Sequence, residues 1–300
     1  ADVLQRDEPG QNKHAVRWGG CFCEHCMKGF NQWLATNGDP AVLRRLGVAD
    51  LEAFDYREHL RAKDAPVGDA FGAWKGDELK AYFVRFQTDS SVAFARWWRE
   101  ELNKKVGREI PISCNNGTRQ WTDIELTFDY CIGELSTSHA TPKFLYAAMR
   151  KAAALDRTQS VTMPLRRTGE EEAPDWVRHT RQTIATVYAT GGHIEMPWDT
   201  YLPTPNGRRY FGKPENYADL TAFVRGMAPF LDGYSDAFAV GGEIMDERWL
   251  DATPPVTPLT DAAGIVAFAR AVPGKAAAPV AVHLVDWREQ TQPFTLSLHP

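Results

Sequence analysis

Short apolar runs that end in polar residues alternate along this chain with long amphipathic stretches, and this alternation constrains the fold more than any other feature of the sequence. It is typical of β/α units built around a parallel sheet. The sequence predicts five such units, with strands at residues 1–5, 110–114, 130–132, 160–165 and 193–196.

Helices are predicted between these strands, at residues 24–36, 50–60 and 77–106, from residue 142, from residue 174, and at 217–231. The longest, from Asp77 to Val106, keeps its apolar residues on one face and is expected to stop at Gly107. Thr141 is expected to cap the helix that begins with Pro142, because a hydroxyl accepts hydrogen bonds from first-turn N–H groups and proline suits the first position.

The pattern changes after residue 236, where helical periodicity fades and prolines interrupt the chain. Residues 280–287 and 294–298 predict antiparallel strands, so we place a domain of β/α units at residues 1–245 and a linker with the start of a β-rich domain at 246–300. Five strands are too few to close an eight-stranded barrel. The chain is therefore either an open doubly wound sheet or part of a longer protein. If it stands alone, the uncovered sheet edge predicts a homo-oligomer or partner chains.

The charge balance, 34 basic against 39 acidic residues with a net charge of −5, contains no basic block that would follow a phosphate backbone. We expect no nucleic-acid partner. No apolar run reaches the roughly 18–20 residues of a membrane helix, and the first residues lack the pattern of a signal peptide. A soluble protein without a membrane partner or a targeting segment is therefore expected.

Polar residues follow each predicted strand, and in a parallel β/α fold the strand ends converge on one face. The candidates for this face are Asp7, Glu8, Asn115, Asn116, Glu134, His139, Glu195, Trp198, Asp199 and Tyr201. Several carboxylates on one face suit glycoside hydrolysis, in which one protonates the leaving oxygen and another attacks the sugar or activates water. The aromatic rings of Trp198 and Tyr201 suit stacking on a sugar. The alternative is that these carboxylates cap helices or pair with Arg6, Arg166 or Arg167.

The stretch L-Q-R-D-E-P-G, followed by C-F-C-E-H-C-M-K-G-F-N-Q-W-L at residues 21–34, resembles the fourth strand and following loop of family 42 glycoside hydrolases, the β-galactosidases of the retaining (β/α)8 clan. The resemblance implies that Glu8 is the general acid/base, with Asp7 at a position where the family has Asn. It also implies that residues 110–116, 130–136, 160–165 and 193–199 are barrel strands five to eight, and that the first three strands are absent. The fold that the resemblance implies is therefore a partial (β/α)8 barrel at residues 1–245, followed by the start of a β-sandwich.

This correspondence shows one departure from the family. The clan carries its nucleophile at the end of the seventh strand, whereas residues 161–165 here read V-T-M-P-L and contain no carboxylate. Glu134 is therefore the first choice for the second carboxylate, and Glu195 the next.

Cys21, Cys23 and Cys26 form a C-x-C-x-x-C motif, and zinc in a structural site takes four tetrahedral nitrogen or sulfur ligands. The motif predicts a structural zinc site. In the resembling family a fourth cysteine comes from an earlier part of the chain; here His14 or His25 would substitute. The alternative is three reduced cysteines without metal. No cofactor is expected for catalysis, because the motif lies well beyond the strand end.

Two hypotheses of function follow. The resemblance implies a glycoside hydrolase acting on a β-linked, galactose-containing oligo- or polysaccharide. The missing carboxylate on the seventh strand favours instead a catalytically inactive carbohydrate-binding protein on a degenerate barrel. A metal-dependent hydrolase is disfavoured, because His139 and His193 are the only histidines near the predicted strand ends.

Overall fold

A computed structural model describes residues 3–7, 9–163, 173–195, 213–240, 257–260, 264–290 and 292–299. The chain divides into two compact units by its internal contacts. Unit 1 comprises Ala1–Cys114 and Trp121–Phe128, and unit 2 comprises Asn115–Gln120 and Asp129–Pro300.

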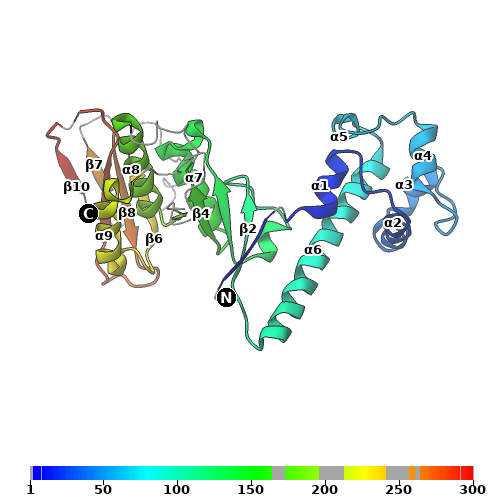
Figure 1. Cartoon of the computed structure of the whole chain (residues 1–300), viewed down its shortest axis with the longest axis horizontal. Helices are drawn as coiled ribbons and strands as arrows, with labels where there is room; N and C mark the ends of the chain where they lie inside the picture. Colours follow the sequence, from blue (N-terminus) through cyan, green and yellow to red (C-terminus); the bar gives the residue numbers. More distant parts are fainter. Residues whose placement is uncertain are drawn as a thin grey trace. The chain divides into compact units, whose positions relative to one another are not determined.

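Unit 1 is mostly helical (Figure 1). Its elements are β1 (Leu4–Arg6), α1 (Gln11–Arg17), α2 (Glu24–Asn37), α3 (Pro40–Arg45), α4 (Tyr56–Ala62), α5 (Ala70–Ala73), α6 (Glu78–Val106), the short 3-10 helix η1 (Glu125–Thr127) and the first residues of β2 (Ile112–Asn116). Strands β1 and β2 run parallel, with Leu4 opposite Ile112 and Arg6 opposite Cys114.

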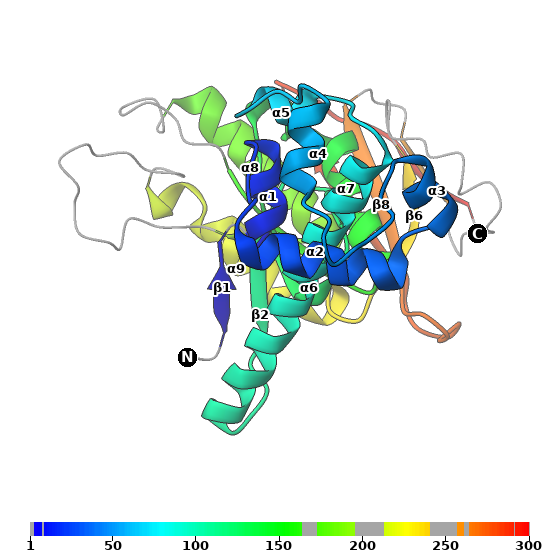
Figure 2. The ribbon, with the colours of Figure 1, turned by 90° about the vertical axis from the view of Figure 1, so that its right-hand side faces the viewer.

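Helix α6 confirms the predicted helix at residues 77–106. The Asp77 side chain accepts a hydrogen bond from the Leu79 N–H, and Gly107 ends the helix with a φ of 75°, a conformation that favours glycine. The predicted apolar stripe is buried over its first half only, since Phe83 is fully buried whereas Trp97 is 55% exposed. Figure 2 shows α1 and α2 beside the beginning of this helix, and both contact it.

An aromatic core holds α2 against α6. The Phe83 ring lies 5.1 Å from Phe30 and 5.0 Å from Phe22, measured between ring centroids. The predicted helix at 24–36 is confirmed as α2, but the one predicted at 50–60 begins too early, since α4 spans Tyr56–Ala62. Helix α4 begins only after Asp55, because that carboxylate accepts a hydrogen bond from the Arg57 N–H and so caps the helix there.

Unit 2 begins as β/α units and ends in antiparallel strands (Figure 1). Its helices are α7 (Pro142–Ala153), α8 (Pro174–Ala189) and α9 (Ala218–Gly226), with 3-10 turns η2 (Thr137–His139), η3 (Pro214–Asn216) and η4 (Ala228–Phe230). Its strands are β3 (Tyr130–Glu134), β4 (Thr158–Thr162), β5 (His193–Glu195), β6 (Ser235–Val240), β7 (Thr257–Thr260), β8 (Ile265–Ala271), β9 (Ala281–Asp286) and β10 (Leu296–His299). The Thr141 hydroxyl caps α7 by accepting a hydrogen bond from the Phe144 N–H, as predicted.

The later strands form two antiparallel sheets, β6–β8–β9 and β7–β10. The predicted strands at 280–287 and 294–298 are confirmed as β9 and β10, but they do not pair with each other: β9 pairs with β8 and β10 with β7. Strands β6, β7 and β8 were not predicted. Strand β6 pairs with β8, so antiparallel pairing begins at Ser235. The predicted domain boundary at residues 245–246 lies outside the described residues and stays a prediction.

The chain is a mixed α/β protein with a five-stranded parallel sheet in the order β1–β2–β3–β4–β5. Sequential order and parallel pairing fit part of an α/β barrel, as the sequence predicted. Among the described residues, none of the helices combines the length and the apolar content needed to cross a membrane.

Candidate functional site

Two of the predicted carboxylates lie in one row of the sheet in unit 2. In the strand register Glu134 of β3 is opposite Thr162 of β4, and Thr162 is opposite Glu195 of β5. Residues that are opposite each other in register point to the same face, and neighbouring strands are about 4.8 Å apart. The Cα atoms of Glu134 and Glu195 are therefore about 10 Å apart, and both side chains are exposed.

The burial of the opposite face shows which way the side chains of this row point. Val161 and Ile194, which precede Thr162 and Glu195, are buried among apolar side chains of the helices. These include Leu145 and Met149 of α7 and Trp176, Ile184 and Val187 of α8. Because successive strand residues alternate between faces, burying the apolar pair leaves the carboxylates on the face away from the helices.

Asn116 takes part in a reciprocal amide pair. Its Nδ2 donates to Gln159 Oε1 at 2.9 Å, and Gln159 Nε2 donates to Asn116 Oδ1 at 3.0 Å. Gln159 is buried and lies two positions before Val161, so it shares the helix-facing side of β4 with that residue. The Asn116 amide thus satisfies a buried polar group, whereas Asn115 is half-buried and belongs to the same strand.

The loop after β2 packs against the end of β3. Thr118 is buried, and its hydroxyl donates to the Glu134 carbonyl oxygen at 3.3 Å. A Cβ atom at Gly133 would overlap the Thr118 side chain, so this close approach requires glycine. The contact ties the backbone of Glu134 to the neighbouring loop.

The remaining predicted residues of this face are placed as follows. His139 is exposed and stacks on Phe144, with ring centroids 4.1 Å apart and planes 4° apart. Asp7 follows β1 in unit 1 and is exposed. Glu8, Trp198, Asp199 and Tyr201 lie outside the described residues, so their roles stay predictions.

Thr162 was not predicted as part of this face, and Thr118 and Arg119 were not predicted to pack beside it, on the helix-facing side of the sheet. The strand was predicted to continue to residue 165, but β4 ends at Thr162, directly before Met163. A polar residue after the buried pair Ser160–Val161 was the available signal for Thr162. For the loop residues Thr118 and Arg119 the sequence gives no comparable pattern, because their placement depends on contacts with β3 and α7.

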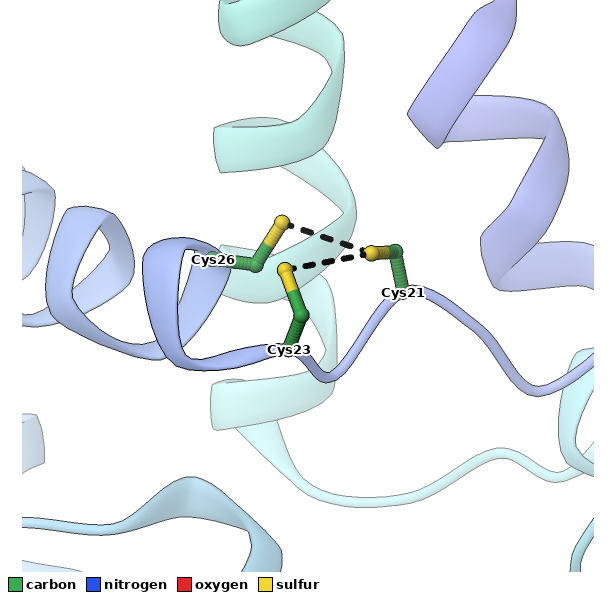
Figure 3. Close-up of side chains that lie close together, drawn as sticks. All are labelled: Cys21, Cys23 and Cys26. Atoms are coloured by element: carbon green, nitrogen blue, oxygen red, sulfur yellow. Dashed lines mark hydrogen bonds between the residues drawn. The ribbon is translucent and has the colours of Figure 1, made fainter.

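The three cysteines of the motif converge in unit 1 (Figure 3). Cys21 Sγ lies 3.6 Å from both Cys23 Sγ and Cys26 Sγ, and all three sulfur atoms lie within 4.8 Å of one another. Zinc–sulfur bonds of about 2.3 Å in a tetrahedron place sulfur atoms about 3.8 Å apart, so this donor set fits a zinc ion. Among the described residues no histidine joins the group, and His14 and His25 are not part of it.

Local structure brings these thiols together. Cys23 is the N-cap of α2 and Cys26 lies in its first turn, where the helix dipole favours negative charge. The backbone N–H of Cys26 lowers the pKa of the exposed Cys23 thiol, whereas burial raises the pKa of Cys26 to about 12. Gln87 of α6 is fully buried beside them, and its Nε2 donates to the Cys21 carbonyl oxygen at 3.5 Å.

Comparison with known proteins finds similarity to two proteins named alpha-agarase. This chain is 26% identical over 238 residues to an alpha-agarase of Alteromonas agarilytica, and 26% identical over 241 residues to an alpha-agarase of Thalassotalea agarivorans. Each similarity covers 75% of this chain but only 16% of the relative, so the chain spans about a sixth of the length of these relatives. No family model matches the chain, and no solved structure matches it.

Proposed function

We propose that this chain belongs to a glycoside hydrolase that acts on a galactan of the agar type, with Glu134 and Glu195 in catalysis. The observation that carries the proposal is the row in which these two exposed carboxylates flank Thr162 on one face of a parallel sheet. The similarity to two alpha-agarases supports the substrate class. Part of a (β/α)8 barrel is the architecture we propose for the sheet, with a β-sandwich beginning after it.

The spacing of the row bears on mechanism. Inverting glycosidases hold their two carboxyl groups about 6.5–9.5 Å apart, which leaves room for water, and retaining enzymes hold them about 5–5.5 Å apart. Two Cα atoms about 10 Å apart on the same face favour the larger separation. One carboxylate then deprotonates water while the other, as the acid, protonates the leaving oxygen. There are two candidates for this acid: Glu8, which the resemblance implies, and Glu195, which lies in the row.

The linkage is the second element of the proposal. The resemblance to β-galactosidases implied a β linkage, but the name of the relatives, alpha-agarase, favours cleavage of an α linkage in agar. Nuclear magnetic resonance of the released ends distinguishes the two linkages, and early time points show whether the anomeric configuration is inverted.

The test compares hydrolysis of agarose and of a β-linked galactan by the parent chain and by Glu134→Gln, Glu195→Gln and Glu8→Gln. Glu289→Gln is the matched control, because this exposed glutamate follows β9 of an antiparallel sheet and not a strand of the parallel sheet. We expect at least about a 100-fold loss for Glu134→Gln and unchanged rates for the control. The second variant that loses activity identifies the acid. Full activity in Glu134→Gln contradicts the proposal, and sugar binding without turnover in the parent favours a carbohydrate-binding protein.

We also propose that Cys21, Cys23 and Cys26 hold a structural zinc ion. The sulfur–sulfur distances and the position at the start of α2 support this proposal. The zinc would stabilise the α2–α6 packing of unit 1. Metal analysis is expected to give one zinc per chain in the parent and none in Cys23→Ser, and cobalt substitution is expected to give thiolate charge-transfer bands. A metal-free parent that refolds in chelator with unchanged stability contradicts the proposal.

A further inference from the structure

A buried glutamine of α6, Gln87, contacts the cysteine cluster of unit 1 from a helix that is far from the cluster in sequence. Its side chain is fully buried, and its Nε2 donates to the carbonyl oxygen of Cys21 at 3.5 Å. The same side chain forms a hydrogen bond with the Cys26 thiol. The Gln87 amide is therefore bonded to two of the three residues of the proposed zinc site.

The other buried polar side chains of α6 find their partners away from the cluster. Lys80 donates to carbonyl oxygens of α5, Thr88 to a carbonyl oxygen one turn earlier in α6, and Ser91 to carbonyl oxygens of α6 and of the residue before α1. Gln87 differs from them, because its Oε1 is buried and has no hydrogen-bond partner among the described residues. An unpaired buried amide oxygen costs free energy, so the benefit of this side chain lies in its amide nitrogen.

The buried side of the cluster needs such a donor once metal is bound. Cys26 is buried and belongs to the apolar core of unit 1, together with Phe30 and Phe86. A cysteine binds metal as the thiolate, which is charged and can only accept hydrogen bonds. A charge in apolar surroundings is costly unless it is paired and hydrogen-bonded, and one zinc ion does not neutralise three thiolates. The NH₂ group of Gln87 has two donors, which suit the Cys21 carbonyl oxygen and the Cys26 thiolate at the same time.

The exposed side of the cluster has a different source of donors. Cys23 is exposed and is the N-cap of α2, and the backbone N–H of Cys26 donates to its thiol. Solvent and the first turn of α2 therefore stabilise a thiolate at Cys23. Gln87 provides from α6 what this helix end provides on the other side.

We propose that Gln87 is a positioning residue of the zinc site, which donates an N–H hydrogen bond to the Cys26 thiolate and thereby raises the affinity of the cluster for the metal ion. This inference rests on the proposed zinc site, because Gln87 acts through Cys26 and does not itself bind the metal. Replacement of residues that orient metal ligands in this way typically lowers metal affinity by about 10–100-fold.

The experiment measures the zinc affinity of the full chain by competition with a chromophoric chelator, together with the absorption spectrum of the cobalt-substituted chain. Gln87→Leu replaces the amide by an apolar side chain, and Gln87→Glu keeps its shape but exchanges the N–H donor for a carboxylate oxygen. Thr88→Val is the matched control, since this neighbouring residue is also buried on α6 and its hydroxyl donates within its own helix. Urea unfolding of the metal-free chains shows whether each variant folds.

We expect the zinc dissociation constant to rise about 10–100-fold in Gln87→Leu and at least as much in Gln87→Glu, where a carboxylate repels the thiolates. Thr88→Val is expected to bind zinc as the parent does. The cobalt–thiolate bands are expected to move to lower energy in Gln87→Leu, because the sulfur lone pairs lose a hydrogen bond, and to stay in place in the control. Metal-free Gln87→Leu is expected to be at least as stable as the metal-free parent, because it also removes the unpaired oxygen.

Parent-like affinity and unshifted bands in Gln87→Leu overturn the inference and leave the zinc site in place. An equal loss of affinity in Thr88→Val also overturns it, because the cluster would then respond to any change in the packing of α6. If Gln87→Leu does not fold, the affinity of Gln87→Glu decides in the same way. A parent that binds no zinc overturns the zinc site and this inference together, so measurement of the parent distinguishes the two failures.

Discussion

The cysteine cluster of unit 1 and the carboxylate row of unit 2 arise in opposite ways. Cys21, Cys23 and Cys26 lie within six consecutive residues, and the start of one helix brings their sulfur atoms together. Glu134 and Glu195 are 61 positions apart in the numbering and meet only because β3, β4 and β5 pair in one register. Spacing along the chain therefore encodes the first site, whereas the second depends on the packing of a whole sheet.

The largest expected effect is a loss of hydrolysis that leaves the cysteine cluster unchanged. Replacement of Glu134 or Glu195 by glutamine is expected to lower the rate of hydrolysis by about 10²–10⁴-fold, because each removes a proton-transfer group. The double variant is expected to lose little more than the worse single variant, since residues that act together are not additive. Zinc content and the unfolding of unit 1 are the parallel readouts, and both are expected to stay at parent values.

Additive losses in the double variant would mean that the two carboxylates act independently, and would contradict a shared role in one reaction. Loss of bound zinc in either variant would show that the two sites depend on each other. Rates are measured on agarose with Glu289→Gln as the reference for an unrelated exposed carboxylate.

A smaller effect is expected from disturbing the contact between Thr118 and Gly133 at the end of β3. In Gly133→Ala the new methyl group overlaps the buried Thr118 side chain, so the loop or the strand must move. Overpacking of this kind costs about 1–3 kcal/mol. Urea unfolding followed by hydrogen exchange is expected to show the loss in the amides of β3 and β4, with those of α6 unchanged.

Thr118→Ala tests the same contact from the other side. With Gly133→Ala it removes the clashing hydroxyl, so the double variant is expected to recover part of the lost stability. A single Gly133→Ala variant as stable as the parent would show that the loop adapts without cost, and would weaken the argument that this contact fixes Glu134.

The contrast also explains what the sequence could predict. Helix α6 follows from its periodicity, its Asp77 cap and Gly107, and Thr141 with Pro142 marks the start of α7; all of these signals lie within a few residues. The helix predicted at 50–60 was given too early a start, because the Asp55 side chain caps the helix that begins at Tyr56. Trp97 fits an apolar stripe by spacing but is 55% exposed, because the second half of α6 extends beyond the aromatic core.

The candidate site shows the same limit. Glu134 and Glu195 could be predicted because each follows an apolar strand, but their alignment through Thr162 could not, since register depends on pairing between distant segments. Asn116 was predicted to bind substrate, and its amide is paired with the buried Gln159. The sequence shows a polar residue at a strand end in both cases and does not show which face it occupies.

The smallest expected effect is a pH dependence confined to unit 2. Burial, together with the positive charge of Arg270, lowers the pKa of His283 on β9 to about 4, whereas an unfolded histidine titrates near 6.5. Between these values the unfolded chain binds a proton that the folded chain does not, so the free energy of unfolding falls as pH drops from about 6.5 to 4. Because the ring is partly exposed and screened by solvent, we expect His283 to contribute about 1–2 kcal/mol.

His283→Leu removes this titration and leaves an apolar side chain opposite the buried Phe268. The variant is expected to lose less stability between pH 7 and pH 4.5 than the parent, as measured by the exchange of β8 and β9 amides. The amides of α6 in unit 1 provide the internal reference, since they are remote in sequence and belong to the other unit. An identical loss in parent and variant would mean that His283 is protonated to the same extent in the folded and the unfolded chain. The pH dependence would then belong to other groups.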